Sequence, residues 1–137
     1  MKKIIVILLL IYSCVDQSPP KTLFTLTNDT EYEVKIESFA RNRDGATILN
    51  GSIKGDDIII NPYGSFMIER VWRDNRTFYS IRNVDSIRLI FNTSKLKIFT
   101  CEDWPNFDSC STIFRANSSY KHIISQDDLN DAIPLNN

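Results

Sequence analysis

Two neighbouring segments alternate between apolar and polar residues, and they constrain the fold more than any other feature. In residues 84–92, VDSIRLIFN, apolar side chains occupy every second position from Ile87 to Phe91. Residues 95–101, KLKIFTC, contain a shorter alternation, and the short link NTS joins the two segments. A period of two places successive side chains on opposite faces of an extended chain, as in a half-buried strand. The pair therefore predicts an antiparallel hairpin.

The rest of the chain offers further strands of the same length. Residues 32–37, YEVKIE, alternate cleanly, and NDT, a sequence typical of turns, separates them from residues 22–28. We therefore expect a hairpin over 22–37. Residues 48–57 contain Gly51 and Gly55 and are expected to be irregular. The remaining predicted strands are residues 58–61, 66–72 and 77–81.

Short strands at this spacing, with turn residues between them, are typical of a β-sandwich or a β-barrel. The sequence predicts an all-β domain of about seven or eight antiparallel strands. A helix is expected only near the C-terminus. There, Ser125 followed by Asp128 forms a capping-box pattern before residues 126–132, and Pro134 would end the helix.

The first residues have the layout of a secretory signal peptide. Lys2 and Lys3 are followed by an apolar run from Ile4 to Ile11. A helix that spans a bilayer needs roughly 20 apolar residues, so this run is too short to remain as a span. The small-residue pattern of ordinary signal-peptide cleavage is missing, and the run ends instead on Ile11-Tyr12-Ser13-Cys14.

This ending resembles the lipobox of bacterial lipoproteins. The resemblance implies that Cys14 carries a diacylglycerol on its sulfur and becomes the first residue of the mature chain. Because each buried CH₂ contributes about 0.8 kcal/mol, two or more acyl chains hold a protein stably on a membrane. The alternative is a plain signal peptide followed by a cysteine without a role.

The number of cysteines agrees with lipidation of Cys14. The chain has three cysteines, and an odd cysteine in a secreted protein needs an explanation. Lipidation would use Cys14 and leave Cys101 and Cys110, which we expect to form a disulfide in an oxidising compartment. Such a bridge would stabilise the fold by roughly 2.5–3 kcal/mol in the chain-entropy model.

These observations divide the chain into three parts. Residues 1–13 are the predicted signal peptide, residues 14–21 are the lipidated cysteine with a polar tether, and residues 22–137 are a single domain. Removing two lysines and no acidic residue changes the net charge from −1 to −3. A nucleic-acid partner is not expected, because it would require a basic surface.

The chain also resembles a group of small, uncharacterised lipoproteins of Bacteroidetes. The segments that carry the resemblance are FTLTNDTEYEVKIESF, then VDSIRLIFN, a cysteine, and finally YKHIISQDDLNDA, in which Leu129 stands where an aromatic residue is expected. The resemblance covers nearly the whole mature chain. It implies an immunoglobulin-like or transthyretin-like sandwich in the cell envelope, and it implies no activity.

Two glycosylation patterns are present. Asp85-Ser86-Ile87 resembles the O-glycosylation signal of Bacteroidetes envelope proteins, which would place a glycan on Ser86; the alternative is a serine on a strand surface. Asn28, like three other asparagines, begins an N-x-[ST] triplet. Those triplets would matter in a eukaryote, and here they are interpreted as asparagine-rich turns.

Catalytic, metal and cofactor patterns are weak in this sequence. His122 is the single histidine, and no G-x-S-x-G elbow accompanies it. A zinc site would need several His or Cys ligands. The acidic run QDDLND lacks EF-hand spacing, and helix capping explains it better than calcium does. We therefore expect no enzyme activity, no metal and no cofactor.

The predicted recognition site is the segment between the two cysteines, CEDWPNFDSC. Trp104 and Phe107 would offer aromatic faces, and Glu102, Asp103 and Asp108 would offer hydrogen-bond acceptors. Aromatic residues on a stiffened loop make good binding anchors, for a glycan or for an envelope protein. The alternative is that both aromatic side chains cap the core. A weaker candidate is Trp72 with Arg70 and Arg73.

Three functions stay open at this point. The chain is predicted to be a non-enzymatic binding module, tethered to a membrane by its lipid. The first alternative is a structural accessory subunit of an envelope complex, and the second is a hydrolase with an unrecognised site. The residues after Cys14, VDQS, lack a dense acidic cluster, so the expected location is the outer membrane with the domain in the periplasm.

Overall fold

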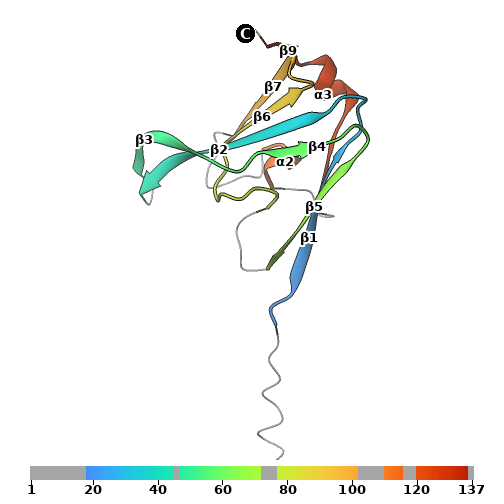
Figure 1. Cartoon of the computed structure of the whole chain (residues 1–137). Helices are drawn as coiled ribbons and strands as arrows, with labels where there is room; N and C mark the ends of the chain where they lie inside the picture. The colour runs from blue at the N-terminus through green and yellow to red at the C-terminus, as the bar shows by residue number, and fades with distance from the viewer. Residues whose placement is uncertain (1–17, 45–46, 72–76, 102–109, 116–119, 136–137) are drawn as a thin grey trace, which may run out of the picture.

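The computed structural model describes residues 18–44, 47–71, 77–101, 110–115 and 120–135 (Figure 1). Strands dominate these residues, and no helix among them is long and apolar enough to cross a membrane. The elements, in chain order, are β1 (Lys21–Asn28), β2 (Val34–Asp44), β3 (Thr47–Lys54), β4 (Ile58–Ile60), β5 (Ser65–Val71), β6 (Ser86–Phe91), β7 (Lys95–Thr100), α2 (Thr112–Arg115), β8 (Lys121–Ile124), α3 (Gln126–Asn130) and β9 (Ile133–Pro134).

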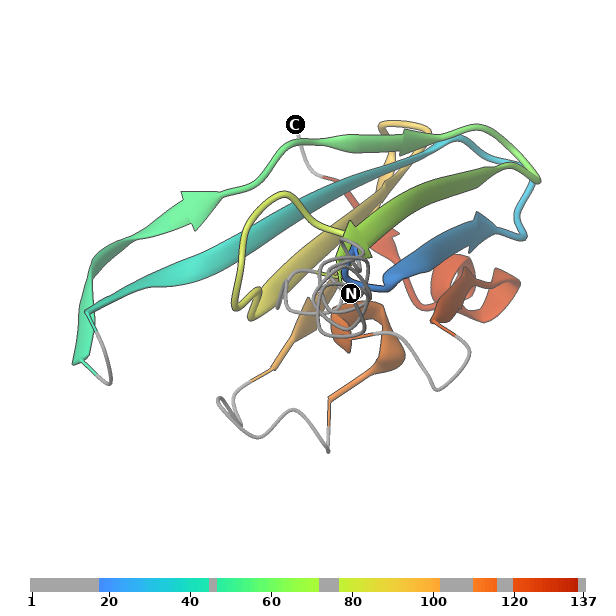
Figure 2. The same ribbon diagram turned by 90° about the horizontal axis from the view of Figure 1, so that it is seen from below.

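The strands form two sheets that pack face to face (Figure 2). The small sheet has the order β5-β1-β8, and the large sheet has the order β3-β2-β6-β7-β9, with β4 also paired to β2. The prediction of an all-β sandwich is confirmed. The strand pairing differs in one respect from the all-antiparallel expectation, because β1 and β8 run parallel from Thr25↔Lys121 to Asn28↔Ile124.

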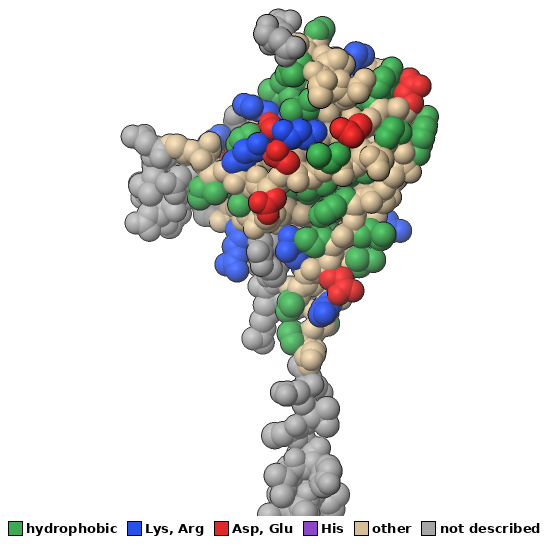
Figure 3. All heavy atoms as spheres, in the orientation of Figure 1, with side chains coloured by type: hydrophobic (Ala, Val, Ile, Leu, Met, Phe, Trp, Pro, Cys, Tyr) green, Lys and Arg blue, Asp and Glu red, His purple; other side chains and the backbone are tan. Residues whose placement is uncertain are grey.

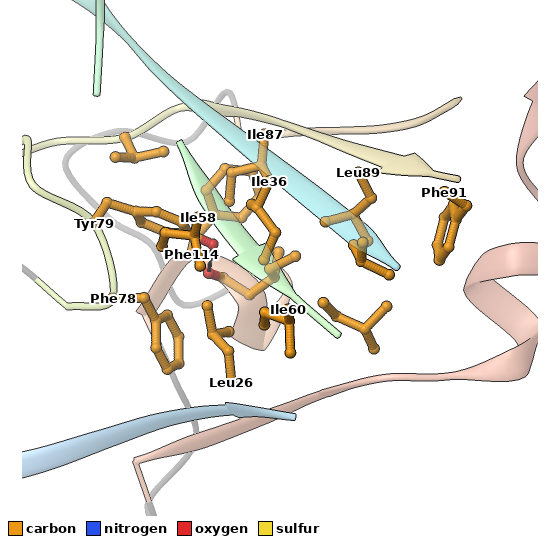
Figure 4. Packing of buried hydrophobic residues seen from close by; sticks show 14 of the residues in the cluster. Leu26, Ile36, Ile58, Ile60, Phe78, Tyr79, Ile87, Leu89, Phe91 and Phe114 are labelled. Carbon is orange, nitrogen blue, oxygen red and sulfur yellow. Dashed lines mark hydrogen bonds between the residues drawn. The ribbon is translucent and has the colours of Figure 1, made fainter. Parts of the chain in front are cut away.

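The core lies between the two sheets and follows the alternation of the strands (Figure 4). Inward positions of β6 are fully buried, as its pattern predicts, and β1, β2 and β4 add their own inward residues. Helix α2 closes the core with Ile113 and Phe114. The fully buried Tyr79 donates its hydroxyl to Ile113 O at 2.9 Å, and burial raises the pKa of this phenol. The labelled core residues in Figure 4 are Leu26, Ile36, Ile58, Ile60, Phe78, Tyr79, Ile87, Leu89, Phe91 and Phe114.

The predicted hairpin over residues 22–37 is wrong. Strand β1 belongs to the small sheet and β2 to the large one, so the chain crosses between the layers where a hairpin turn was expected. Asn28, which ends β1, is fully buried at this crossing. Its side-chain amide donates to Tyr32 O at 2.7 Å and to Asn61 O at 3.0 Å, so it joins the crossing to the segment after β4.

Two other segments differ from their predictions. Residues 77–81 form bends and not a strand, because the side chain of Arg70 donates to Thr77 O at 3.2 Å and to Tyr79 O at 2.9 Å. The region expected to be irregular contains β3, which pairs with β2 across a register shift. Gly51 has φ +100°, a left-handed conformation that glycine adopts readily. The distal part of this β2–β3 ribbon extends beyond the sandwich (Figures 1 and 2).

The β6–β7 hairpin and the C-terminal helix are confirmed. Ser94 N donates to Phe91 O at 3.0 Å and closes the turn between β6 and β7. Ser125 and Asp128 form the predicted capping box at the start of α3. Lys97 of β7 donates to Asp128 Oδ1 at 3.0 Å and to Asp131 Oδ2 at 2.9 Å, so α3 is fastened to the large sheet.

Candidate functional site

The predicted disulfide between Cys101 and Cys110 is present, with the two Cα atoms 5.5 Å apart. Cys101 is buried in the core, and Cys110 packs against the core from the outside. The five recognition residues proposed between them, Glu102, Asp103, Trp104, Phe107 and Asp108, lie outside the described residues. Both interpretations of that loop, a binding site or a cap on the core, therefore stay predictions.

Asp85 fastens the disulfide to the large sheet. Cys101 N donates to Asp85 O at 2.8 Å, and Asp85 N donates to Phe39 O at 3.0 Å. The buried carboxylate of Asp85 accepts from Arg41 N at 3.1 Å and lies 3.5 Å from Arg41 Nε. The aspartate of the Asp-Ser-Ile motif therefore has a structural role, and it orients the arginine at the base of the β2–β3 ribbon.

A pocket of about 260 Å³ opens beside this arginine, and we call it the ribbon-base pocket. Its apolar lining comes from Ala40 and Ile53, which face each other across β2 and β3, and from Ile81 of the bent segment. Arg41, Arg82 and Asn83 supply its polar lining. The site thus combines residues from three segments that are far apart in the sequence.

Gly55 allows the bent segment to approach the ribbon this closely. A Cβ atom at this position would lie 2.5 Å from Ser38 Oγ and 3.2 Å from Ile81 Cγ1, so a larger residue would displace the wall of the pocket. Backbone hydrogen bonds also join this stretch to β2 and to the bent segment. Gly55 N donates to Ser38 O at 2.9 Å, and Asp56 N donates to Ser80 Oγ at 2.8 Å.

The ribbon-base pocket has the composition of a site for a small ligand group. Binding pockets are mostly apolar and contain a few polar groups that orient the ligand. A guanidinium offers five N–H donors in a planar fork that matches a carboxylate. Arg41 Nε lies 3.5 Å from the Asp85 carboxylate, so Asp85 offsets part of the positive charge in this lining. Sequence reasoning missed the pocket, because no local spacing connects residues 40–41, 53 and 81–83.

The outer face of the large sheet contains a cluster of balanced charges, visible on the side turned to the viewer in Figure 3. Lys35 and Lys54 each contact Glu37 and Asp57 at 2.9–3.0 Å. The hydrogen bond from Lys35 lowers the pKa of Glu37, and the hydrogen bond from Lys54 lowers the pKa of Asp57. Since the four charges neutralise one another, the cluster holds β2, β3 and the β3–β4 link together and is a poor ligand site.

His122 lies on β8 and contacts Thr112 Oγ1 of α2 through its Nδ1 at 2.8 Å. Burial lowers the pKa of this imidazole, and the charge of Asp128 acts in the opposite direction. Its Nε2 is buried and has no hydrogen-bond partner within the described part of the chain. A catalytic triad needs a third group that orients the histidine, and the contact with Thr112 is better described as a tie between α2 and β8.

The remaining predicted site residues are dispersed. Ser86 begins β6, half-buried, between Phe39 of β2 and Thr100 of β7, and its glycosylation stays a prediction. The side chain of Arg70 donates a hydrogen bond to the bent segment at Thr77 O. Trp72, Arg73 and Cys14 lie outside the described residues. Within the residues that the structure describes, no group of three or more His, Cys, Asp or Glu side chains could hold a metal ion.

Comparison of the chain with protein-family models, with curated proteins and with solved structures found no match. The ribbon-base pocket and the surfaces around it are therefore interpreted from their own chemistry.

Proposed function

We propose that the protein is a lipid-anchored binding module of a bacterial cell envelope, without catalytic activity of its own. The support for the anchor comes from the sequence, in which a short apolar leader ends on Ile11-Tyr12-Ser13-Cys14. This arrangement, the resemblance to Bacteroidetes lipoproteins and the use of the other two cysteines in a disulfide favour the same location. The domain would then face the compartment on the outer side of its membrane.

The binding role rests on one observation, the ribbon-base pocket. An apolar surface formed by Ala40, Ile53 and Ile81 lies beside Arg41, Arg82 and Asn83. We propose that this pocket binds a carboxylate carried on an apolar body, with the polar residues of the lining contacting the anion and the three apolar side chains contacting the rest. The shared chemistry fits a small organic acid as well as an acidic group of a larger partner.

Amide NMR of the mature chain tests this proposal, with octanoate and 3-phenylpropionate as probes. We expect shift changes at Ala40, Ile53 and Ile81 that saturate with probe concentration. Octanol, which lacks the charge, should bind more weakly by roughly tenfold, the factor expected for one charge-assisted hydrogen bond. Shifts that are absent, or that spread over both sheets without saturation, would overturn the proposal.

A pair of matched variants separates the pocket from general charge effects. Arg82→Gln should weaken octanoate binding by roughly tenfold or more. Arg88→Gln removes the same charge from the outer face of the large sheet, where the guanidinium lies 4.9 Å from the Phe39 ring centroid, and should leave binding unchanged. Equal losses in both variants would indicate nonspecific attraction of the anion and would argue against the pocket.

A further inference from the structure

The outer face of the small sheet exposes a group of large apolar side chains. Leu23 of β1 is 51% exposed, Met67 of β5 is 62% exposed and Ile123 of β8 is 58% exposed. Val71, at the end of β5, is 38% exposed. We call these four residues the small-sheet patch. All of them point away from the core, because their strand neighbours Phe24, Ile68 and Ile124 point toward it.

The strand register makes Leu23, Met67 and Val71 neighbours and places Ile123 further along the sheet. Leu23 lies opposite Glu69, so Met67 and Val71 are its diagonal neighbours on β5. On the other side of β1, Thr27 lies opposite Ile123. Leu23, Met67 and Val71 therefore reach one another across the sheet, whereas Thr25 and Thr27 lie between them and Ile123. Single exposed apolar residues are normal on a protein surface, whereas a continuous patch marks a surface that contacts something else.

The patch lies on the strand that directly follows the proposed anchor. Strand β1 begins at Lys21, seven residues after Cys14. A fully extended chain spans about 3.3–3.6 Å per residue, so Lys21 would stay within about 25 Å of the lipidated cysteine. Leu23 is two residues further along. The chain therefore enters the small sheet at the end of β1 that carries Leu23, and a lipid on Cys14 would hold this end of the sheet close to the bilayer.

The charges around the patch suit a membrane surface. Lys21 and Lys121 flank the apolar residues, and Glu69 forms an ion pair with Lys21 at 3.5 Å. Among the outward positions of the described strands β1, β5 and β8, the charged side chains are these two lysines and this glutamate. Lysines beside exposed apolar side chains favour the interface of a bilayer with anionic lipids.

We propose that the outer face of the small sheet rests on the lipid surface that holds the anchor, with Leu23, Met67 and Ile123 at the headgroup level. This inference rests on the proposed lipid anchor and adds an orientation to it. The outer face of the large sheet lies on the opposite side of the sandwich (Figure 2), so it would be turned away from the membrane. The domain would thus contact the membrane surface directly and would not be held away from it by an extended tether.

Met67 supplies a direct probe of this orientation. The chain has two methionines, Met1 and Met67, so the mature chain has Met67 alone. The mature chain would be labelled at the methionine methyl and coupled through Cys14 to a maleimide lipid, in nanodiscs of phosphatidylethanolamine and phosphatidylglycerol. Gadolinium-chelating lipids should then broaden the Met67 signal beyond detection. A sharp Met67 signal under these conditions would overturn the proposal.

The matched control moves the label to the other face. Met67→Leu combined with Ile98→Met places the single methionine on the outer face of the large sheet, at a position with 50% exposure. Both substitutions keep an exposed apolar side chain, so folding should be preserved. Its signal should stay sharp in the same nanodiscs. Equal broadening of both labels would mean that the domain tumbles without a preferred face, which contradicts the proposal.

A second measurement uses the mature chain without any lipid, as Cys14→Ser, and vesicles of the same composition. Replacing Leu23 and Ile123 by Asn should lower vesicle binding by on the order of tenfold, the factor expected for two half-exposed apolar side chains. Replacing Ile59 and Ile98 by Asn, on the large sheet, should leave it unchanged. Binding that both pairs reduce equally would overturn the orientation.

The anchor itself is tested separately, by the intact mass of the protein from its own host. A mass that begins at Cys14 and includes acyl chains supports the anchor, and a mass without lipid rejects it. The nanodisc experiment supplies its own lipid, so the two failures are distinguishable. If the anchor is present but Met67 stays sharp, the anchor stands and the membrane orientation is wrong.

Discussion

Asn28 occupies the corner at which the chain leaves the small sheet for the large one. It is fully buried, and its Oδ1 accepts from Thr30 N at 3.1 Å and from Thr30 Oγ1 at 2.8 Å. Its amide donates to backbone carbonyls on two segments, including Ile60 O at 3.3 Å. One side chain therefore satisfies polar groups that would otherwise be buried without partners.

Asn28→Ala should lower the free energy of unfolding by about 2–4 kcal/mol, because several buried polar groups lose their partner. Urea denaturation followed by circular dichroism measures this change. Asn130→Ala serves as the control, since Asn130 is exposed at the end of α3 and should change stability by less than about 0.5 kcal/mol. A similar small effect at both positions would contradict the role assigned to Asn28.

This residue also shows a limit of sequence interpretation. Asn28 begins an N-x-[ST] triplet and lies in a segment, NDT, that is typical of turns. The same composition suits a hairpin turn and a buried corner, because in both cases the asparagine side chain bonds to nearby backbone. Which of the two forms depends on the distant carbonyls of Ile60 and Asn61, and no local pattern reveals them.

At the scale of elements, local information was sufficient where the contacts are local. The β6–β7 hairpin pairs Ser86↔Thr100 through Phe91↔Lys95, so its alternation and its turn lie within fifteen consecutive residues. The capping box of α3 lies within four residues, and the sequence predicts it correctly. In contrast, residues 77–81 have the composition of a strand but do not form one. The side chain of Arg70 donates hydrogen bonds to two of their backbone carbonyls, which a neighbouring strand would otherwise have to bond.

The turn of the β6–β7 hairpin contains a strained residue. Asn92 and Thr93 are the central residues of the turn that Ser94 N and Phe91 O close, and their φ values of +45° and +57° make both of them left-handed. Asparagine tolerates this conformation, whereas a β-branched threonine does not. Thr93→Gly should therefore raise the free energy of unfolding by about 0.5–1 kcal/mol.

The matched control is Asn92→Gly, which replaces a residue that already suits the turn. It should leave the free energy of unfolding within about 0.5 kcal/mol of the natural chain. Thermal and urea denaturation of the two variants, side by side, measure the difference. A destabilised Thr93→Gly would show that the threonine side chain makes contacts worth more than its backbone strain.

At the scale of the whole molecule, the all-β class and the disulfide could be predicted, but the candidate site could not. The class follows from alternation, which is a property of each segment. The ribbon-base pocket forms only when Ile53, Ile81 and Arg41 meet, and this depends on sheet order and on the close approach at Gly55. The parallel pairing of β1 with β8 is likewise a contact between distant segments.

The bridge between Cys101 and Cys110 closes one end of the sandwich. Its reduction should lower the free energy of unfolding by roughly 2.5–3 kcal/mol, because the unfolded chain gains the freedom of the closed loop. Urea denaturation with and without reductant measures this. A Cys101→Ala/Cys110→Ala variant provides the control, because its stability should not respond to reductant. Equal stability of the oxidised and reduced protein would show that other contacts already restrain residues 101–110.

The parallel pairing of β1 with β8 also sets an order of events during synthesis. A chain is synthesised from its N-terminus. Strand β1, which contains Thr25, can pair with β8 only after Lys121 has been added, so the small sheet cannot be complete before then. Contacts between such distant segments form late and slowly. The small sheet is therefore complete only after nearly the whole chain has been synthesised, so the last strand to join it comes from the opposite end of the sequence.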